Sequence, residues 1–563
     1  MSKFSGRIAA LLAGTALVGA CAVQGRESAP VPAQPAPAAG LATTPEITEA
    51  DLRERLYKIA DDSMAGRPTG SPGHIKTTDY IAAEMRRLGL QPAGENGTYF
   101  QAVPFVNRVT SVNEISVDGA PLTVRTDFIS VPESGAQANF TTAEVVYGGF
   151  IDDSTTWISA DQANGRFVVL RLSSLQVLRQ GVPSIGNSNR FDQAVAVGIA
   201  GFGPVFPQVV AFFGDPDGPA YQDGETSGPP MYYLSDAAAN KALGASATTL
   251  QPGATGGKAT GRRVITEEPL VARNVVAMLP GTDAKLRGQF VAIGAHSDHD
   301  PVAETSVDHD SLRAVNLEAR RRELELGRSL SQQERASIRV NLDSLRAIRP
   351  ARRDSILNGA DDDGSGTVAL LEIAESMAQA NNKPKRSVLF VWHVAEELGL
   401  IGANHFTRFP TVPRDSIVTA LNIDMIGRGG PGEEEAGGPD YLQLIGWRRL
   451  SNELGDVIEA VNKERAQPFK FDLQYDAPGH PEQYYCRSDH YMYARYGIPV
   501  AFFSTGSHAD YHQVTDEPQY IDYSKLRNVT QLIHDVAMRV AGLPQPPAVD
   551  GEKPTDPNQP CRQ

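Results

Sequence analysis

The second half of the chain alternates between two hydrophobic patterns. Short apolar runs rich in β-branched residues predict buried strands, and apolar residues spaced three and four apart predict helices between them. The runs that predict strands span residues 275–279, 291–295, 387–394, 418–424 and 498–504. The helical patterns span residues 367–380, 452–462 and 524–541. Strands separated by helices predict an α/β fold, with a doubly wound, largely parallel mixed sheet that has helices on both faces.

The first half of the chain has a different pattern of apolar and polar residues. It begins with two helical patterns, at residues 51–62 and 74–88. Short β-branched runs with frequent Gly and Pro follow, and three of them predict strands, at residues 143–147, 166–172 and 195–202. No group of catalytic or metal-ligand residue types gathers in this region. We therefore expect a β-rich accessory domain over residues 131–264.

One segment interrupts the α/β alternation. Residues 307–348, within the segment 301–357, are rich in Arg, Glu, Leu and Ser, and they show helical periodicity without a strand pattern. We expect a helical insertion of one or two helices, whose charge is typical of a solvated helix face. At the other end, residues 543–563 are polar and rich in proline, which predicts a disordered tail.

The N-terminus has the pattern of an exported lipoprotein. A short basic start precedes an apolar run over residues 8–20, which is too short for a typical spanning helix and resembles a secretory signal. The run ends at Cys21 after small residues, as in a bacterial lipobox, although plain cleavage nearby is an alternative. We expect a signal peptide over residues 1–21 and a Pro/Ala-rich tether over residues 22–46. The predicted route is secretion across the inner membrane, followed by outer-membrane attachment through lipidated Cys21, facing the periplasm or the cell surface.

The composition and net charge of the chain limit the kinds of molecule that it is expected to bind. The 563 residues carry a formal net charge of −15, which argues against nucleic acid as a partner. The hydrophobic fraction of 41% allows a substantial core. With three cysteines, the chain is not stabilised by a disulfide framework. The sequence leaves open whether Cys486 and Cys561 pair, although an exported protein would allow it, and it leaves the oligomeric state open.

The first candidate for chemistry lies at the end of one predicted strand. The run 387–394 is followed by two adjacent carboxylates, Glu396 and Glu397, at the edge where α/β sheets hold ligands. Successive side chains point different ways, so one glutamate could bind a metal ion while the other acts as a base. An isolated Glu-Glu pair is more typical of the first turn of a helix. Other ligand-type residues are needed to decide between these interpretations.

Four further stretches place such residues at predicted strand ends or in turns. His296 ends a strand, and Asp298 lies two residues later on the same side, where it could orient the imidazole. Asp424 ends an otherwise apolar strand, and a buried aspartate is costly unless it is paired or metal-bound. The remaining two are the turn 361–363, with three aspartates, and the segment 508–516, with two histidines.

Each stretch alone has an ordinary explanation, such as a solvated turn, a weak calcium site, a core histidine or a helix cap. Together they place imidazoles and carboxylates at one edge of the predicted sheet. Two imidazoles, one bridging carboxylate and two terminal carboxylates are enough for a pair of divalent ions. Nitrogen and oxygen donors without a thiolate suit zinc, with manganese or cobalt as substitutes.

Five motifs, in chain order, resemble those of the M28 family of zinc-dependent peptidases, which includes bacterial aminopeptidases. They are HSD, GADDDGSG, EELGLIG, NIDMIGR and YHQVTD. The resemblance implies an M28-like peptidase domain over residues 47–130 and 265–542, and residues 131–264 resemble the protease-associated domain often inserted there. The insertion 301–357 departs from the family, whose members usually have a short loop at this point. Its flanks lie beside the predicted site, so it could form a wall or lid over the cleft.

The resemblance also implies a set of metal ligands. His296 and Asp424 would hold one zinc ion, and Glu397 and His512 would hold the other. Asp362 would bridge the two ions.

A catalytic set is implied beside these ligands. Glu396 would be the general base, Tyr511 would hydrogen-bond the developing oxyanion, and Asp298 would support the neighbouring histidine ligand. Family members typically have a cis peptide bond after the bridging aspartate, here Asp362. The motif at residues 488–490 also matches the family, but its role stays unassigned.

The implied function is that of a zinc-dependent aminopeptidase, which removes N-terminal residues from peptide substrates by a two-metal mechanism with a glutamate base. The alternatives are a glutaminyl cyclase-like acyltransferase, a carboxypeptidase of the same family and an inactive binding protein on this fold. The last alternative predicts eroded ligands, whereas the sequence retains all five metal positions and the base. The preferred N-terminal residue and peptide length stay open.

Overall fold

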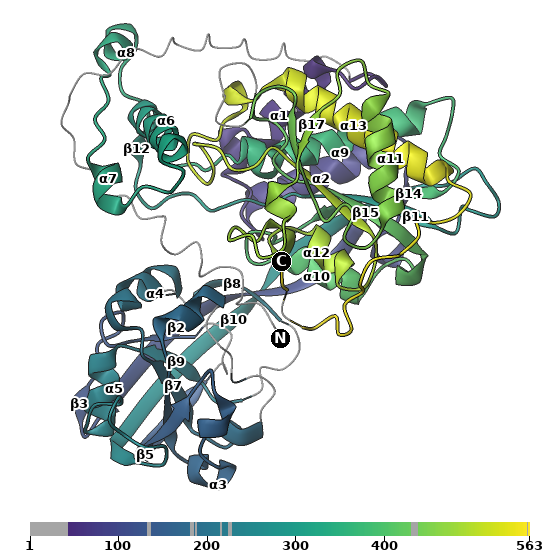
Figure 1. The fold of residues 1–563 in the computed structure, drawn as a ribbon. Helices are drawn as coiled ribbons and strands as arrows, with labels where there is room; N and C mark the ends of the chain where they lie inside the picture. The colour runs from purple at the N-terminus through teal and green to yellow at the C-terminus, as the bar shows by residue number, and fades with distance from the viewer. Residues whose placement is uncertain are drawn as a thin grey trace. The chain divides into compact units, whose positions relative to one another are not determined.

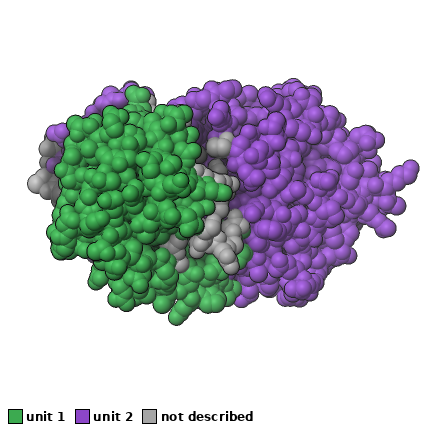
Figure 2. All heavy atoms as spheres, turned by 90° about the horizontal axis from the view of Figure 1, so that it is seen from below, with its two compact units in different colours: residues 1–14, 104–271 green, residues 15–103, 272–563 purple. Residues whose placement is uncertain are grey.

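The computed structural model describes residues 43–131, 137–180, 185, 189–213, 217–222, 228–429, 437–559 and 561–563. Within this part the chain forms two compact units, one of residues 104–271 and one of residues 43–103 with 272–563 (Figure 2). The predicted signal peptide, Cys21 and nearly all of the predicted tether lie outside the described residues. No described helix combines the length and apolar character needed to cross a membrane.

The larger unit is built on a mixed sheet, which confirms the predicted fold class. Its strands run in the order β17-β16-β18-β15-β11-β14-β10, and β1 also pairs with β10. Neighbours β18, β15, β11 and β14 are parallel, whereas β10 and β16 join this group in antiparallel orientation. The bounds are β1 Gln91–Pro92, β10 Thr255–Leu279, β11 Phe290–His296, β14 Ser387–His393, β15 Ile417–Ile423, β16 Tyr441–Ile445, β17 Lys470–Asp472 and β18 Val500–Ser504.

Helices cover both faces of this sheet (Figure 1). Along β10, Val275 and Ala277 enter a core formed with α1, α9, α11 and α13, whereas Val276 enters a second core formed with α10 and α12. Successive residues of a strand point to opposite faces, so a continuous apolar run fits a sheet that is buried on both sides. The helices are α1 Glu49–Ile59, α2 Pro72–Arg87, α9 Gly366–Gln379, α10 Ile401–Arg408, α11 Asn452–Lys463, α12 His490–Ala494 and α13 Tyr523–Gly542.

The insertion contains more structure than its sequence predicts. Three helices are present, and a two-residue antiparallel pair joins its two ends, Val307 to Asp354 and Asp308 to Arg353. A ladder this short has no hydrophobic period of its own, which is why no strand was predicted there. The bounds are β12 Val307–Asp308, α6 His309–Leu326, α7 Gln332–Ala336, α8 Asp343–Ile348 and β13 Arg353–Asp354.

The smaller unit extends beyond the predicted 131–264 on both sides, because the long strands β2 and β10 belong to it in part. Its central strands β5, β6, β7 and β9 are mutually parallel, with α5 packed on one face and α3 and α4 on the other. The bounds are β2 Phe100–Val117, β3 Ala120–Pro121, β4 Phe128–Ser130, β5 Ala138–Phe150, α3 Ala160–Ala163, β6 Phe167–Arg171, β7 Ala196–Ala200, α4 Phe206–Phe213, β8 Gly218–Tyr221, β9 Met231–Leu234 and α5 Asp236–Leu243.

The tail that we expected to be disordered is held against the larger unit. Cys486 and Cys561 form a disulfide, which answers the question that the sequence left open. The amide of Asn452 donates to Asp550 at 2.9 Å, and the amide of Gly551 donates to the carbonyl of Leu450 at 3.2 Å. Composition predicted disorder because it reports the lack of an apolar core, and it does not register a covalent anchor.

The disulfide gives a first prediction. Replacing Cys561 in the variant Cys561→Ser should lower the free energy of unfolding by about 2–4 kcal/mol, because the bond closes a long loop in the unfolded chain. Denaturant titration of both proteins measures this difference. Adding a reductant should destabilise only the parent protein, and equal stability of parent and variant would contradict the prediction.

Candidate metal centre

Three neighbouring parallel strands place acidic and imidazole side chains at one edge of the sheet. His296 is the last residue of β11, Asp424 directly follows β15, and Glu396 and Glu397 follow β14 in the turn before α10. Because β11 lies between β15 and β14, the carboxyl ends of these strands meet at one edge. The glutamates precede α10 by several residues, so they are not the acidic first turn of that helix.

Two loops complete the arrangement. Asp362 lies in the turn before α9 and is followed by a cis peptide bond to Asp363, as the family resemblance implied. His512 lies in the loop after β18, here called the 505–517 loop. Oδ1 of Asp362 is 3.1 Å from Nε2 of His296, and Oδ2 is 3.0 Å from Nε2 of His512. The structure therefore places the two oxygens of one carboxylate against two different imidazoles.

The remaining predicted ligands flank this carboxylate. Oδ1 of Asp424 is 3.7 Å from Nε2 of His296, and Oε2 of Glu397 is 3.4 Å from Nε2 of His512. The five side chains thus form two groups of one imidazole and one carboxylate, which share Asp362. This is the arrangement expected of a site for two divalent ions.

The protonation of the imidazoles tests whether these residues fit a metal ion. Nδ1 of His296 is 3.0 Å from the main-chain carbonyl of Asp298, which can only accept, so Nδ1 carries the proton. Nε2 of His296, a residue only 1% exposed, faces the carboxylates of Asp362 and Asp424 and makes no hydrogen bond. His512 repeats the pattern, with Nδ1 2.8 Å from Oδ2 of Asp300 and Nε2 without a hydrogen bond. Imidazole nitrogens that face carboxylates without a hydrogen bond fit a cation bound between them, and this donor set suits zinc.

Asp298 contacts His296 in a different way from the one predicted. Its carboxylate Oδ1 is 3.8 Å from Nδ1 of His296, and the main-chain carbonyl makes the close contact instead. The carboxylate accepts from the amide of Glu396 at 3.2 Å and from the hydroxyl of Thr69 at 3.2 Å. The side chain of Asp298 therefore fixes the turn that presents Glu396.

Glu396 and Tyr511 lie beside the ligand cluster. Oε2 of Glu396 is 4.0 Å from Nε2 of His296, and the ring of Tyr511 is 4.1 Å from that of His512, centroid to centroid. Burial raises the pKa of Glu396 well above its usual value, with Glu397 adding to the shift and His296 opposing it. Burial also raises the pKa of Tyr511, so its hydroxyl stays protonated and can donate. A cation beside Glu396 would restore its charged, basic form.

Several contacts around the predicted ligands were not predicted. Nδ1 of His299 is 2.8 Å from Oε1 of Glu397, and the hydroxyl of Ser488 donates to Oδ2 of Asp424 at 2.7 Å. The second contact gives the motif at residues 488–490 a role, because it orients a predicted ligand. Asp300 lies two residues after Asp298, just as Asp298 lies two residues after His296. This repeated spacing could have identified Asp300.

The turn that carries Asp362 is held by buried charges. Oδ2 of Asp516 accepts from the amides of Asp361 at 2.9 Å and Asp362 at 3.1 Å. The guanidinium of Arg67, which is fully buried, donates to the two main-chain carbonyls of residues 358–359 at 2.6 and 2.9 Å. Both contacts fix the backbone of the turn, so the carboxylate of Asp362 is free to face the imidazoles.

The insertion contacts the 505–517 loop. Nε of Arg313 is 3.4 Å from Oδ2 of Asp510, and Nη2 of Arg320 donates to the carbonyl of Ser507 at 3.4 Å. These contacts lie in the loop that carries Tyr511 and His512. The wall or lid predicted for the insertion stays a prediction.

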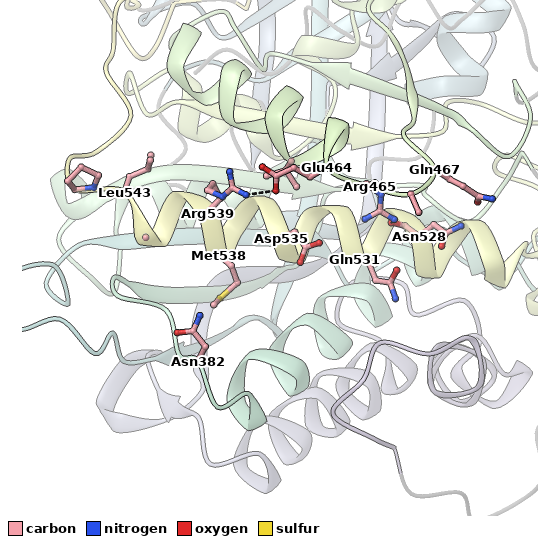
Figure 3. Close-up of a pocket in the computed structure, with 14 residues that line it drawn as sticks. Asn382, Glu464, Arg465, Gln467, Asn528, Gln531, Asp535, Met538, Arg539 and Leu543 are labelled. Atoms are coloured by element: carbon pink, nitrogen blue, oxygen red, sulfur yellow. Dashed lines mark hydrogen bonds and ion pairs between the residues drawn. The ribbon is translucent and has the colours of Figure 1, made fainter.

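A surface pocket of about 840 Å³ lies elsewhere, between α11 and α13 (Figure 3). Its lining includes Asn382, Gln531 and Met538, and an ion pair between Arg539 and Glu464 crosses it at 2.7 Å. None of the predicted site residues lines this pocket. The predicted site residues therefore lie away from this pocket.

Known proteins resemble the part of the chain that carries this centre. Residues 274–537 match the model of Peptidase family M28. Leupeptin-inactivating enzyme 1 of Streptomyces exfoliatus is 42% identical over 82 residues, which cover 14% of this chain and 19% of that protein. Leucine aminopeptidase 1 of Paracoccidioides brasiliensis strain Pb18 is 31% identical over 177 residues, 30% of this chain and 43% of that protein. The chain thus aligns with less than half the length of these curated relatives.

A comparison with solved structures found a similar chain of nearly the same extent. The aminopeptidase from Aneurinibacillus sp. strain AM-1 is 18% identical, with a TM-score of 0.49. The likeness covers 90% of this chain and 97% of that one.

The contact between His512 and Asp300 gives a second prediction. The variant Asp300→Asn should bind zinc about 10–100-fold more weakly, because the amide no longer polarises the imidazole as a carboxylate does. Competition with a chromophoric chelator measures this affinity. Asp283→Asn, at a carboxylate that accepts from the amide of Lys285 at 2.7 Å, is the matched control and should bind zinc as the parent does. Equal affinity in Asp300→Asn would refute the role of Asp300.

Proposed function

We propose that the chain is a zinc-dependent aminopeptidase, which hydrolyses the first peptide bond of peptide substrates, and the match of residues 274–537 to the model of Peptidase family M28 supports this proposal. One observation carries the proposal: Asp362 lies between the orphaned Nε2 atoms of His296 and His512, with Glu396 beside them. The printed name of one matched relative, Leucine aminopeptidase 1, supports the exopeptidase class.

The residues would hold two zinc ions. His296 and Asp424 would bind one, His512 and Glu397 the other, and Asp362 both. When bound, the ions would polarise the substrate carbonyl and make water easier to deprotonate. The nitrogen and oxygen donors, without a thiolate, favour zinc over softer metals. The contact of the Nδ1 atom of His296 with the carbonyl of Asp298, and that of His512 with the carboxylate of Asp300, fix both imidazoles in the ligating tautomer.

Glu396 would transfer the proton. Its carboxylate lies beside the imidazole of His296, where a water attacking the carbonyl carbon would be within reach. It would take a proton from that water and give it to the nitrogen of the leaving amine as the C–N bond breaks. The backbone contact with Asp298 holds Glu396 in place for both transfers.

Tyr511 would stabilise the oxyanion. Its hydroxyl keeps its proton because burial raises its pKa, so it can donate a hydrogen bond to the oxygen that gains negative charge. The insertion braces the loop that carries Tyr511 through Arg313 and Arg320. The loop is thereby pre-positioned, and no reorganisation is needed as the charge develops.

The reaction class is tested with free and N-acetylated aminoacyl p-nitroanilides, with and without chelator. We expect cleavage of the free substrates only, and loss of that cleavage when the metal is removed. Cleavage of the acetylated substrates at the same rate would overturn the aminopeptidase assignment. Full activity in the presence of chelator would overturn the metal requirement.

The base assignment gives a third prediction. Glu396→Gln should lower kcat by about 10²–10⁴-fold, because the amide cannot accept the proton. Its zinc content should equal that of the parent, since Glu396 is not a proposed ligand. Steady-state kinetics and elemental analysis of the same sample provide both numbers. A variant with normal kcat would exclude Glu396 as the base.

The oxyanion assignment gives a fourth prediction. Tyr511→Phe should lower kcat about 100-fold or more and leave KM nearly unchanged, because the lost hydrogen bond forms in the transition state. Tyr475→Phe, at a tyrosine that stacks on Tyr484, is the matched control and should retain parental kcat. An increase in KM with kcat unchanged would show that Tyr511 acts in substrate binding instead.

A further inference from the structure

A second group of ligand-type side chains lies outside the centre described above. His309 begins α6 of the insertion, Asp354 belongs to β13 of the insertion, and Glu517 ends the 505–517 loop. One ligand atom from each of these three residues lies within 4.8 Å of the other two. The group therefore joins the two ends of the insertion to the loop that carries His512.

The imidazole of His309 is the decisive feature of this group. The residue is 0% exposed, and neither ring nitrogen makes a hydrogen bond. Its Nε2 is 3.4 Å from Oε1 of Glu517, and Nδ1 is 3.6 Å from Oδ1 of Asp310. A buried imidazole without a hydrogen bond is costly, because it has given up its contacts with water without replacement.

The separation between His309 and Glu517 matches one in the main centre. Nε2 of His512 is also 3.4 Å from its flanking carboxylate oxygen, Oε2 of Glu397. A zinc ion bound at about 2.0–2.1 Å to a histidine nitrogen and a carboxylate oxygen separates the two donors by about this distance in tetrahedral geometry. The same distance between an imidazole nitrogen without a hydrogen bond and a carboxylate oxygen thus occurs at His309 and Glu517, which belong to none of the five family motifs.

The charges around the group leave room for a cation. Arg352 pairs with Glu517 at 3.1 Å. The neighbouring acids Asp308 and Asp310 are paired with Arg346, and Asp310 also with Arg349. Asp354 accepts from the amide of Ile356 at 3.1 Å. Among the described residues, the carboxylates of Asp354 and Glu517 lie close to each other, and the ion pair with Arg352 reaches Glu517.

The protonation states agree with ligation. Burial, together with Arg352, lowers the pKa of His309 to about 4, so the ring is neutral at pH 7, as a ligand must be. Burial raises the pKa of Glu517 to about 7, with Arg352 opposing the shift and Asp354 adding to it. A divalent cation would stabilise both carboxylates in their charged form.

We propose that His309, Asp354 and Glu517 bind an additional divalent cation of the zinc class. The ion ties the insertion to the 505–517 loop, and it is structural, because none of its ligands touches the predicted catalytic residues. Two other contacts lie at the same junction. The ring of His309 stacks on that of Tyr520, and the guanidinium of Arg313 lies over the ring of Tyr520, 3.8 Å from its centroid. The proposal does not depend on the catalytic assignment, since the site is built from separate residues.

Anomalous diffraction from crystals of the full chain, grown with zinc chloride, tests the site directly. Data collected above and below the zinc absorption edge should show a peak about 2.0–2.3 Å from Nε2 of His309 and from an oxygen of Asp354 or Glu517. Peaks at the main centre with none here would overturn the proposal. A peak here with an empty main centre would uphold it and contradict the proposed function instead.

Zinc stoichiometry of the dialysed protein tests the same site in solution. His309→Ala and Asp354→Asn should each contain one zinc per chain less than the parent. Asp343→Asn, which changes an exposed carboxylate of the insertion, is the matched control and should lose none. Two independent ligand variants keep the test decisive if one of them fails to fold. Unchanged zinc content in a folded ligand variant would refute the proposal.

Discussion

The structure depends on the close approach of like charges at one edge of a sheet. Asp362, Asp424, Glu396 and Glu397 lie within a few ångströms of two imidazoles whose Nε2 atoms make no hydrogen bond. Charges buried this closely are strongly unfavourable without a counterion. The buried guanidinium of Arg67 does not pair with these carboxylates, because it donates to main-chain carbonyls of the Asp362 turn. A divalent cation bound within the cluster would offset the repulsion between its carboxylates.

The fold assembles this cluster in two layers. Parallel neighbours β15, β11 and β14 end at the same edge, so one side chain from each end is enough to bring distant parts of the sequence together. Around them, Asp298, Asp300, Ser488 and Asp516 each contact a predicted ligand or the backbone beside one. This outer layer fixes tautomer and orientation, which decide whether a nitrogen or oxygen can bind a metal at all.

The sequence predicted what depends on strong local pattern. Strands β11, β14, β15 and β18 were placed to within about two residues, because buried strands have long apolar runs, whereas the predicted strand 275–279 is only the end of the long strand β10. The short strands β16 and β17 were missed, since the first is interrupted by Gln443 and the second has three residues. The inner cluster was predicted because its residues follow strands, and motif order linked them to a family.

Contacts between side chains far apart in the chain could not be predicted in this way. The hydroxyl of Ser488 meets Asp424 across 64 positions, and Asp516 meets the amide of Asp362 across 154. The ordered tail could not be predicted either, because its composition is typical of disorder and the disulfide from Cys561 to the distant Cys486 anchors it. The spacing predicted that Asp298 lies beside His296, but it could not decide whether the carboxylate or the main-chain carbonyl makes the close contact.

The central claim is that Asp362 bridges a pair of metal ions, and zinc X-ray absorption fine structure tests it most directly. The zinc-loaded parent protein should show metal–metal scattering at about 3.5–4 Å, the separation usual in two-metal sites. That scattering should vanish in Asp362→Ala. A loaded parent protein with no metal–metal scattering, or an Asp362→Ala protein that retains it, would contradict the account.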